Sequence, residues 1–294
     1  MNLATLAREA PFARPLAVPA WTLGCWKRRC ITYANGREDA ETTVIWIQSH
    51  GLTGDLRIPR WRPSAEGKMD FGDFSADALA LLASVEGGVA DTSWSGDRMA
   101  WSNWSAFQPY DKWPEPGVLQ RVGTSLIEWA PSGIYVEDWR LQPGSSGLMV
   151  GLRLEAEIRQ GVRRRRDGGL VICGDHALFT LGRFEELPEE IPAQRQLAQG
   201  AARIFEAEAS YCAREGDGFR VVLSTNPFRH GEAAPFDDGF EAVEPDLLRQ
   251  TVGDVVRVWR VDTLLPAVEV PLATPASAAG LAWLEKEAGV LLRS

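Results

Sequence analysis

The sequence lacks any hydrophobic run long enough to cross a membrane, since no stretch approaches the ~20 apolar residues that a spanning helix needs. The first 21 residues mix acidic and basic side chains, without the basic start and apolar core of a signal peptide. An excess of basic charge is also lacking, since 31 Lys and Arg stand against 40 Asp and Glu. The 294 residues carry a net charge of -9, and binding to phosphate backbones needs a basic surface. We therefore expect neither a membrane nor a nucleic-acid partner.

Cysteine and histidine are too few and too scattered for a zinc site. The four cysteines form no CxxC pair, and the three histidines do not cluster near them. Free, mostly buried thiols in a reducing compartment are the expected state, which predicts a cytoplasmic protein. No metal and no cofactor is predicted. The residues concerned are Cys25, Cys30, Cys173, Cys212, His50, His176 and His230.

No motif names a reaction. The sequence has no GxGxxG, Walker loop or HExxH, and no GxSxG. The run from Gly144 to Gly147, GSSG, lacks the strand–elbow–helix context of a nucleophilic serine. The dense basic run Arg163–Arg166 is interpreted as the solvated tip of a hairpin rather than an anion site. An enzyme is therefore not indicated, although carboxylate chemistry stays open below.

Short strands with regular turns are what the sequence does contain. Around 126–141, LIEWAPSGIYVEDWRL predicts a hairpin that turns at Pro131–Gly133. Alternation places Tyr135, Glu137 and Trp139 on one face, a mixture suited to the inside of a barrel with a polar-aromatic pocket. About ten or more strands with only two or three helices, not alternating with strands, predict an all-β, mostly antiparallel fold.

The chain divides best at residues 142–147, QPGSSG, the clearest linker or wide turn. This predicts two lipocalin-like β-barrel lobes, 1–145 and 146–294, with one or two peripheral helices. Helices are expected at 75–84, at about 191–208 in the second lobe, and at 276–292, where Leu281, Trp283 and Leu284 form the apolar side. Residues 1 to about 20 are expected to be irregular.

Tryptophan is abundant, with 12 residues, nine of them between Trp26 and Trp139. One interpretation is a Trp-rich core that closes the barrel ends. The other is a ligand pocket, because barrel mouths are common sites for small molecules. Its candidate walls are Trp46, Trp101, Trp104, Trp129 and Trp139.

A polar set accompanies these aromatics: Asp55, Arg57, Glu128, Glu137 and Arg140. Asp55 and Arg57 share a face of the strand LTGDLRIP, and Arg57 could pair with Glu128 or Glu137 as well. Buried charges must be paired, so a structural salt-bridge network is one interpretation. The other is anchoring of a polar ligand group, with Arg57 holding an anion.

Two short motifs carry a resemblance. Gly-x-x-x-Asp-x-Arg-x-Pro and Tyr-x-Glu-x-Trp-Arg occur within a segment of about residues 20 to 265 that resembles the fungal Hrr-interacting protein family and its bacterial relatives. The resemblance implies two lipocalin-type (calycin) barrels in tandem and supplies no settled activity and no catalytic residues. The motifs match at Gly51, Asp55, Arg57 and Pro59, and at Tyr135, Glu137, Trp139 and Arg140.

Three hypotheses follow. The first is a protein that binds a small apolar or amphipathic molecule in the N-terminal barrel. The second is an enzyme that uses barrel carboxylates, and the third is an interaction protein with filled barrels, which leaves a protein partner open. A cavity above ~300 Å³ would favour the first two. The predicted ligand-binding residues are Asp55, Arg57, Trp101, Trp104, Glu128, Tyr135, Glu137 and Trp139.

Overall fold

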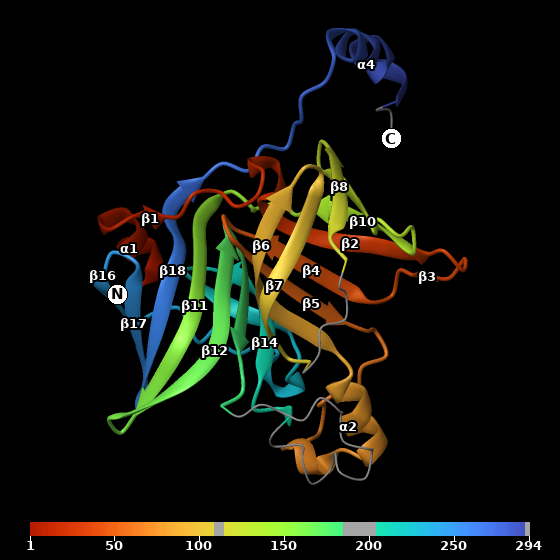
Figure 1. The fold of residues 1–294 in the computed structure, drawn as a ribbon. Coiled ribbons are helices and arrows are strands. Elements are labelled where there is room, and N and C mark those ends of the chain that lie inside the picture. The colour runs from red at the N-terminus through yellow and green to blue at the C-terminus, as the bar shows by residue number, and fades with distance from the viewer. Residues whose placement is uncertain (109–114, 185–203, 292–294) are drawn as a thin grey trace.

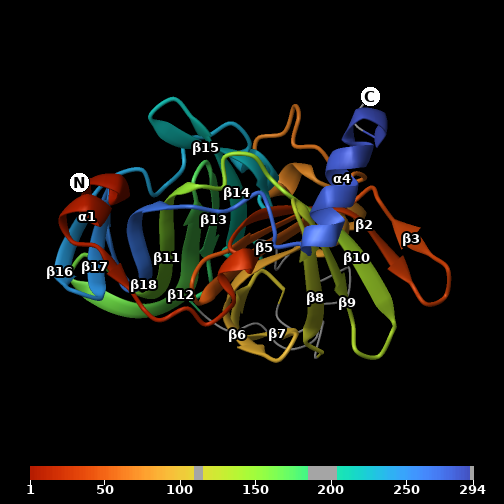
Figure 2. The same ribbon diagram turned by 90° about the horizontal axis from the view of Figure 1, so that it is seen from above.

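The structure is a computed structural model, and it describes residues 1–108, 115–184 and 204–291. Antiparallel strands dominate these residues, and the strands form two large sheets that lie side by side (Figures 1 and 2). The prediction of an all-β, mostly antiparallel chain is confirmed.

The first sheet is a closed barrel of eight strands. Its order is β10-β9-β8-β7-β6-β5-β4-β2, and pairing of β10 with β2 closes the ring. The short strand β3 (Glu38–Asp39) extends β2 outside the ring. The barrel strands are β2 (Gly24–Tyr33), β4 (Thr43–Gln48), β5 (Leu52–Ile58), β6 (Glu86–Ser95), β7 (Arg98–Ala106), β8 (Gly117–Val122), β9 (Ser125–Trp129) and β10 (Tyr135–Leu141).

The second sheet contains the later strands in the order β15-β14-β13-β12-β11-β18-β17-β16. Among the described residues no ladder joins β15 to β16, so this sheet is not closed as the first one is. Its strands are β11 (Gly147–Arg159), β12 (Val162–Cys173), β13 (His176–Leu181), β14 (Glu208–Glu215), β15 (Gly218–Ser224), β16 (Phe240–Glu244), β17 (Leu247–Val252) and β18 (Val255–Val268).

The N-terminal segment joins the second sheet rather than the barrel that follows it in sequence. Strand β1 (Phe12–Ala13) pairs with β18, and helix α1 (Leu3–Glu9) buries Leu3 and Leu6 in the core of that sheet. An irregular segment was expected here, and this prediction was wrong. The Asn2 side chain accepts a hydrogen bond from the Thr5 N–H at 2.9 Å and so caps the start of the helix. The helix ends at Glu9, two residues before Pro11.

One core joins the two sheets. It combines residues of the first sheet, such as Leu56 and Val89, with Val171 and Leu178 of the second. The two sheets approach closely at Gly169 of β12, where an added Cβ would lie only 2.6 Å from Val89 Cγ1. The barrel wall and the second sheet therefore pack as interlocking surfaces.

Helix α2 (Ala76–Ala83) begins where the sequence predicted, because Ser75 Oγ accepts a hydrogen bond from the Ala78 N–H at 3.2 Å. Of three short 3₁₀ turns, η1 (Ala20–Thr22) and η3 (Pro227–Arg229) lie between strands, and η2 (Phe71–Asp73) precedes α2. The helix predicted at 191–208 lies mostly outside the described residues, and its last position, Glu208, begins β14.

Helix α4 (Ala278–Leu291) forms as predicted, but its expected apolar side is exposed: Leu281 by 54%, Trp283 by 57% and Leu284 by 46%. In Figure 1 it stands beyond the end of the barrel. The run Arg163–Arg166 belongs to β12 itself rather than to a hairpin tip, which lies at the preceding residues 160–161. No helix of the described residues meets the length and apolarity of a membrane span.

Candidate ligand-binding site

The hairpin of β9 and β10 supplies one wall of the site. Alternation turns Leu126 and Glu128 inward on β9, while Ile127 is exposed. On β10 it turns Tyr135, Glu137 and Trp139 inward and leaves Val136 exposed. The hairpin predicted at 126–141 and its two faces are thus confirmed. Glutamates that would ordinarily face water are held inside the barrel by this register.

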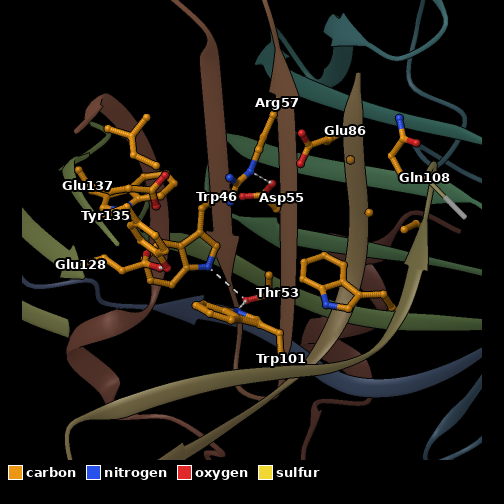
Figure 3. Close-up of a pocket in the computed structure, with 16 residues that line it drawn as sticks. Trp46, Thr53, Asp55, Arg57, Glu86, Trp101, Gln108, Glu128, Tyr135 and Glu137 are labelled. Atoms are coloured by element: carbon orange, nitrogen blue, oxygen red, sulfur yellow. Dashed lines mark hydrogen bonds and ion pairs between the residues drawn. The ribbon is translucent and has the colours of Figure 1, made fainter. Parts of the chain in front are cut away.

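Strand β5 supplies the facing wall by the same rule. Its residues Thr53, Asp55 and Arg57 point into the barrel, and Leu52, Leu56 and Ile58 pack into the core on the other face. In Figure 3, Asp55 and Arg57 lie near the middle of the pocket, with Glu128, Tyr135 and Glu137 grouped to one side.

These walls enclose a cavity of about 110 Å³. All eight predicted ligand-binding residues line it, as does Trp46, whereas Trp129 and Arg140 are not among its lining residues. Sequence reasoning missed seven further lining residues: Ile31, Thr53, Glu86, Gly87, Gly88, Ala106 and Gln108. Thr53 could have been found, because it shares the face of Asp55 and Arg57.

Arg57 is fixed by its neighbour on the strand. Its Nε donates to Asp55 Oδ1 at 2.8 Å. Burial opposes the charge of Arg57, but the carboxylates of Asp55, Glu137 and Glu86 together raise its pKa well above the usual value. Arg57 is therefore a permanent cation in an acidic surrounding. This arrangement does not favour the predicted anchoring of an anion.

Glu137 pairs with a residue that the sequence did not single out. Arg28 of β2 lies opposite Trp139 and donates from Nη1 to Glu137 Oε1 at 2.7 Å, and from Nη2 to Asp39 Oδ2 at 2.9 Å. The Arg28 side chain is 4% exposed and that of Glu137 only 2%. The ion pair compensates the cost of burying both charges.

Glu128 has a different environment. It lies directly across from Glu137 in the β9–β10 ladder, and its Oε1 accepts a hydrogen bond from the Tyr135 hydroxyl at 3.0 Å. Among the described residues it forms no ion pair within 4.0 Å. Burial, followed by the Glu137 charge, raises the pKa of Glu128 to about 8, although Arg57 lowers it. Burial and the same carboxylates also raise the pKa of Tyr135.

The indole N–H groups of the pocket are not all satisfied. Trp46 Nε1 donates to Thr53 Oγ1 at 3.2 Å, and Trp101 Nε1 donates to the same hydroxyl at 3.3 Å (Figure 3). Trp139 packs edge-on to Trp46 with ring centroids 5.6 Å apart. Its Nε1 is buried and has no hydrogen-bond partner in the described part of the chain. A buried donor without a partner costs free energy unless a bound molecule accepts from it.

The histidines and cysteines do not converge. His176 hydrogen-bonds to the Tyr211 hydroxyl at 2.8 Å and to the Pro143 carbonyl at 2.7 Å, while His50 and His230 bond to backbone carbonyls elsewhere. The four cysteines are unpaired. Within the described ranges, no group of three or more His, Cys, Asp or Glu side chains is arranged to hold a metal ion.

Comparison with known proteins gives no assignment. No family model and no curated protein matches the chain. Among solved structures, a DNA polymerase sliding clamp from Pseudomonas aeruginosa aligns with 88% of this chain at 8% identity and a TM-score of 0.13. The alignment spans 61% of that clamp, and a score this low supports no argument about fold or function.

Proposed function

We propose that the chain is a lipocalin-like protein that binds a small molecule in the aromatic and polar cavity of its N-terminal barrel. The observation that carries the proposal is that the buried carboxylates, Arg57 and the Trp walls all face one cavity. A barrel kept only for structural reasons is expected to fill such a space with side chains. The resemblance to the Hrr-interacting family supports the same architecture.

The second sheet provides a contrast that favours the first lobe as the binding site. Its buried Glu157 accepts from Arg257 Nε at 3.0 Å and from Arg166 Nη1 at 2.8 Å. Arg257 also lies 5.4 Å from the centroid of Phe179. Charge is compensated within this group, as expected for a structural network. The filled-barrel hypothesis therefore fits the second lobe better than the first.

The size of the cavity limits the ligand. At about 110 Å³ it is smaller than the roughly 300–1,000 Å³ of sites for drug-sized molecules. It also falls below the ~300 Å³ that would have favoured binding or catalysis over a filled barrel, so cavity size alone does not support the proposal. The proposal narrows to a compact molecule. Such a ligand would be held mainly by aromatic faces and by one or two polar contacts.

A carboxylate enzyme is the second candidate. Glu128 is a buried carboxyl whose pKa of about 8 lies near neutrality, as a general acid or base requires. If this hypothesis holds, incubation with the protein converts a bound molecule into a product that chromatography and mass spectrometry separate from it, and incubation with Glu128→Gln does not. Unchanged ligand in both samples favours binding alone.

The four unpaired cysteines support the expected cytoplasmic location.

Native mass spectrometry of protein purified from its own host tests the binding proposal. We expect a reproducible adduct of small mass on the wild-type chain. Ala106→Phe, which places a ring in the cavity lining, should remove it. Val122→Phe is the matched control because Val122 is 69% exposed on β8. Absence of any adduct, or an adduct retained by the Ala106 variant, would count against the N-terminal cavity.

A further inference from the structure

We propose that the ligand of this cavity is a compact organic cation of the alkylammonium type, with the Glu128 carboxylate as its counter-ion. This inference rests on the proposed function, since it names the class of molecule that the cavity binds. Four observations support it: the pairing of two glutamates, the commitment of the nearby arginines, the aromatic walls, and an unpartnered indole N–H.

The first observation is the cross-strand pair. Glu128 on β9 and Glu137 on β10 are direct partners in the antiparallel ladder, and both point into the barrel. Their exposures are 4% and 2%. Like charges directly opposite each other destabilise a sheet unless a cation or a proton intervenes. Arg28 supplies that cation for Glu137, so Glu128 is the member of the pair that has none in the described chain.

The second observation is that the two buried arginines are already committed. Arg57 is bonded to Asp55 on its own strand, and Arg28 is bonded to Glu137 and Asp39. Asp55 and Glu137 thus each have an arginine partner. Glu128 is left with a hydroxyl donor, Tyr135, and no ion pair in the described chain. A cation beside Glu128 would pair with the carboxylate that these arginines leave without an ion pair, whereas an anion there would meet the charges of Glu128 and Glu137.

The neighbouring strand β8 leaves space for the Glu128 carboxyl group, because it has a glycine, Gly117, beside it. A Cβ on Gly117 of β8 would lie 2.8 Å from Glu128 Oε1. With any other residue at 117, the Glu128 carboxyl group would have to move from its present position. Gly117 thus leaves the space that the Glu128 carboxyl group occupies on the cavity wall.

The aromatic walls complete the chemistry. Trp46, Trp101, Trp104 and Trp139 line the same cavity as Glu128. Indole faces attract alkylammonium groups through the ring quadrupole, and aromatic cages with an acidic residue are the usual recognition of such cations. The Trp139 side chain is 1% exposed, and its N–H has no partner among the described atoms. It would donate to a hydroxyl or carbonyl oxygen carried by the ligand.

Proton release should accompany binding. At neutral pH the Glu128 carboxyl is mostly protonated, since its pKa is raised to about 8. The groups that face it are Glu137 and Tyr135 of β10, Asp55 and Arg57 of β5, and Glu86 of β6. A cation that needs the ionised form expels this proton. Its apparent affinity should then rise about tenfold between pH 7 and pH 9.

Choline and its neutral isostere 3,3-dimethyl-1-butanol separate charge from shape, because they differ only in a nitrogen or a carbon at the quaternary centre. Isothermal titration calorimetry of the full chain would measure the affinity for each molecule at pH 7 and at pH 9. We expect choline to bind more tightly at pH 9 than the isostere by at least tenfold. In Glu128→Gln both the pH dependence and the preference for the cation should be lost, while binding of the isostere persists and reports an intact fold.

The outcomes distinguish the two proposals. If the isostere binds as tightly as choline at both pH values, the cation inference is wrong and the cavity proposal stands. If choline keeps its preference in Glu128→Gln, a different group is the counter-ion and the inference is also overturned. If neither molecule binds and native mass spectrometry shows no adduct, the proposed function itself fails.

Discussion

At Glu128, burial and a neighbouring negative charge act in the same direction. Loss of water disfavours the carboxylate, and Glu137 across the ladder disfavours it further. Glu137, by contrast, is bonded to Arg28 at 2.7 Å. Two glutamates on adjacent strands thus differ in their partners, because Glu137 is bonded to an arginine and Glu128 to the Tyr135 hydroxyl.

Protonation of Glu128 gives the first prediction. Its folded-state pKa of about 8 lies above the ordinary value of 4.5, so the folded chain binds an extra proton between these limits. The stabilisation is complete below about pH 4 and is lost as pH rises through about 8. Over this window the free energy of unfolding should fall by an amount on the order of a few kcal/mol.

Urea denaturation from pH 5 to pH 9 measures this fall. The control is Glu128→Gln, which keeps the shape of the side chain and removes the titration. We expect its stability profile to be flatter than that of the wild type and to lie above it at pH 9. Parallel profiles for the two proteins would show that folding does not raise the pKa of Glu128.

The site residues could be predicted from the sequence where the alternation of side chains along a single strand decides which face they lie on. Alternation along β5 and β10 was enough to place Asp55, Arg57, Tyr135 and Glu137 on inward faces. Arg28 was missed because its role depends on the pairing of β2 with β10, which joins residues 109 positions apart. A bulge between Asp138 and Trp139 also shifts that register. Such long-range pairing has no local signal.

At the scale of elements, the sequence predicted the strands and turns better than it predicted the structure near the N-terminus. The early β-branched segments became β4 and β5, and Ser75 begins α2. The hairpin expected around Arg163–Arg166 gains a third strand, because Gly174 and Asp175 form a tight turn between β12 and β13. Residues 3–9 form a helix because Leu3 and Leu6 bury against the second sheet, a contact that composition alone does not reveal.

Contact between elements of the two sheets gives the second prediction. Gly169 of β12 lies so close to β6 that an added Cβ would meet the β-branched Val89, with Val89 Cβ only 2.9 Å away. Neither side chain can rotate out of the way, so the strands must separate. We expect Gly169→Ala to lower the free energy of unfolding by about 1–3 kcal/mol.

A matched glycine without neighbours provides the control. A Cβ added to Gly289 of α4 would meet no atom within 4 Å, and alanine favours a helix over glycine. Gly289→Ala should therefore leave the urea midpoint unchanged or raise it slightly. Equal midpoints for the Gly169 variant and the wild type would mean that the sheets separate at little cost.

For the whole molecule, the sequence and the packing divide the chain differently. Barrel strands end at Leu141 and the second sheet begins at Gly147, which agrees with the expected linker. Yet β1 belongs to the second sheet, and the larger core cluster takes residues from both sheets. The division of the chain at 145 remains a prediction. Sequence patterns show where strands cluster along the chain, but they do not show which sheet faces pack together.

A shared core predicts that both sheets unfold in one transition. Cys25 of β2 belongs to the joint core, and Cys212 of β14 belongs to the separate core of the second sheet. Both are 0% exposed, so a thiol reagent reaches them only after unfolding. If Val171 and Leu178 couple the sheets as the packing indicates, neither sheet can open without exposing apolar surface of the other.

Pulsed thiol labelling across a urea series, read by mass spectrometry, measures the two sites separately. The expected result is one common midpoint for Cys25 and Cys212. Cys30, which is partly exposed, should react before the transition and confirm that the reagent is active. An earlier midpoint for Cys212 would show that the second sheet opens while the barrel stays folded. In that case the barrel and its cavity would form an independent unit, and the interlocking of Gly169 with Val89 would contribute little to stability.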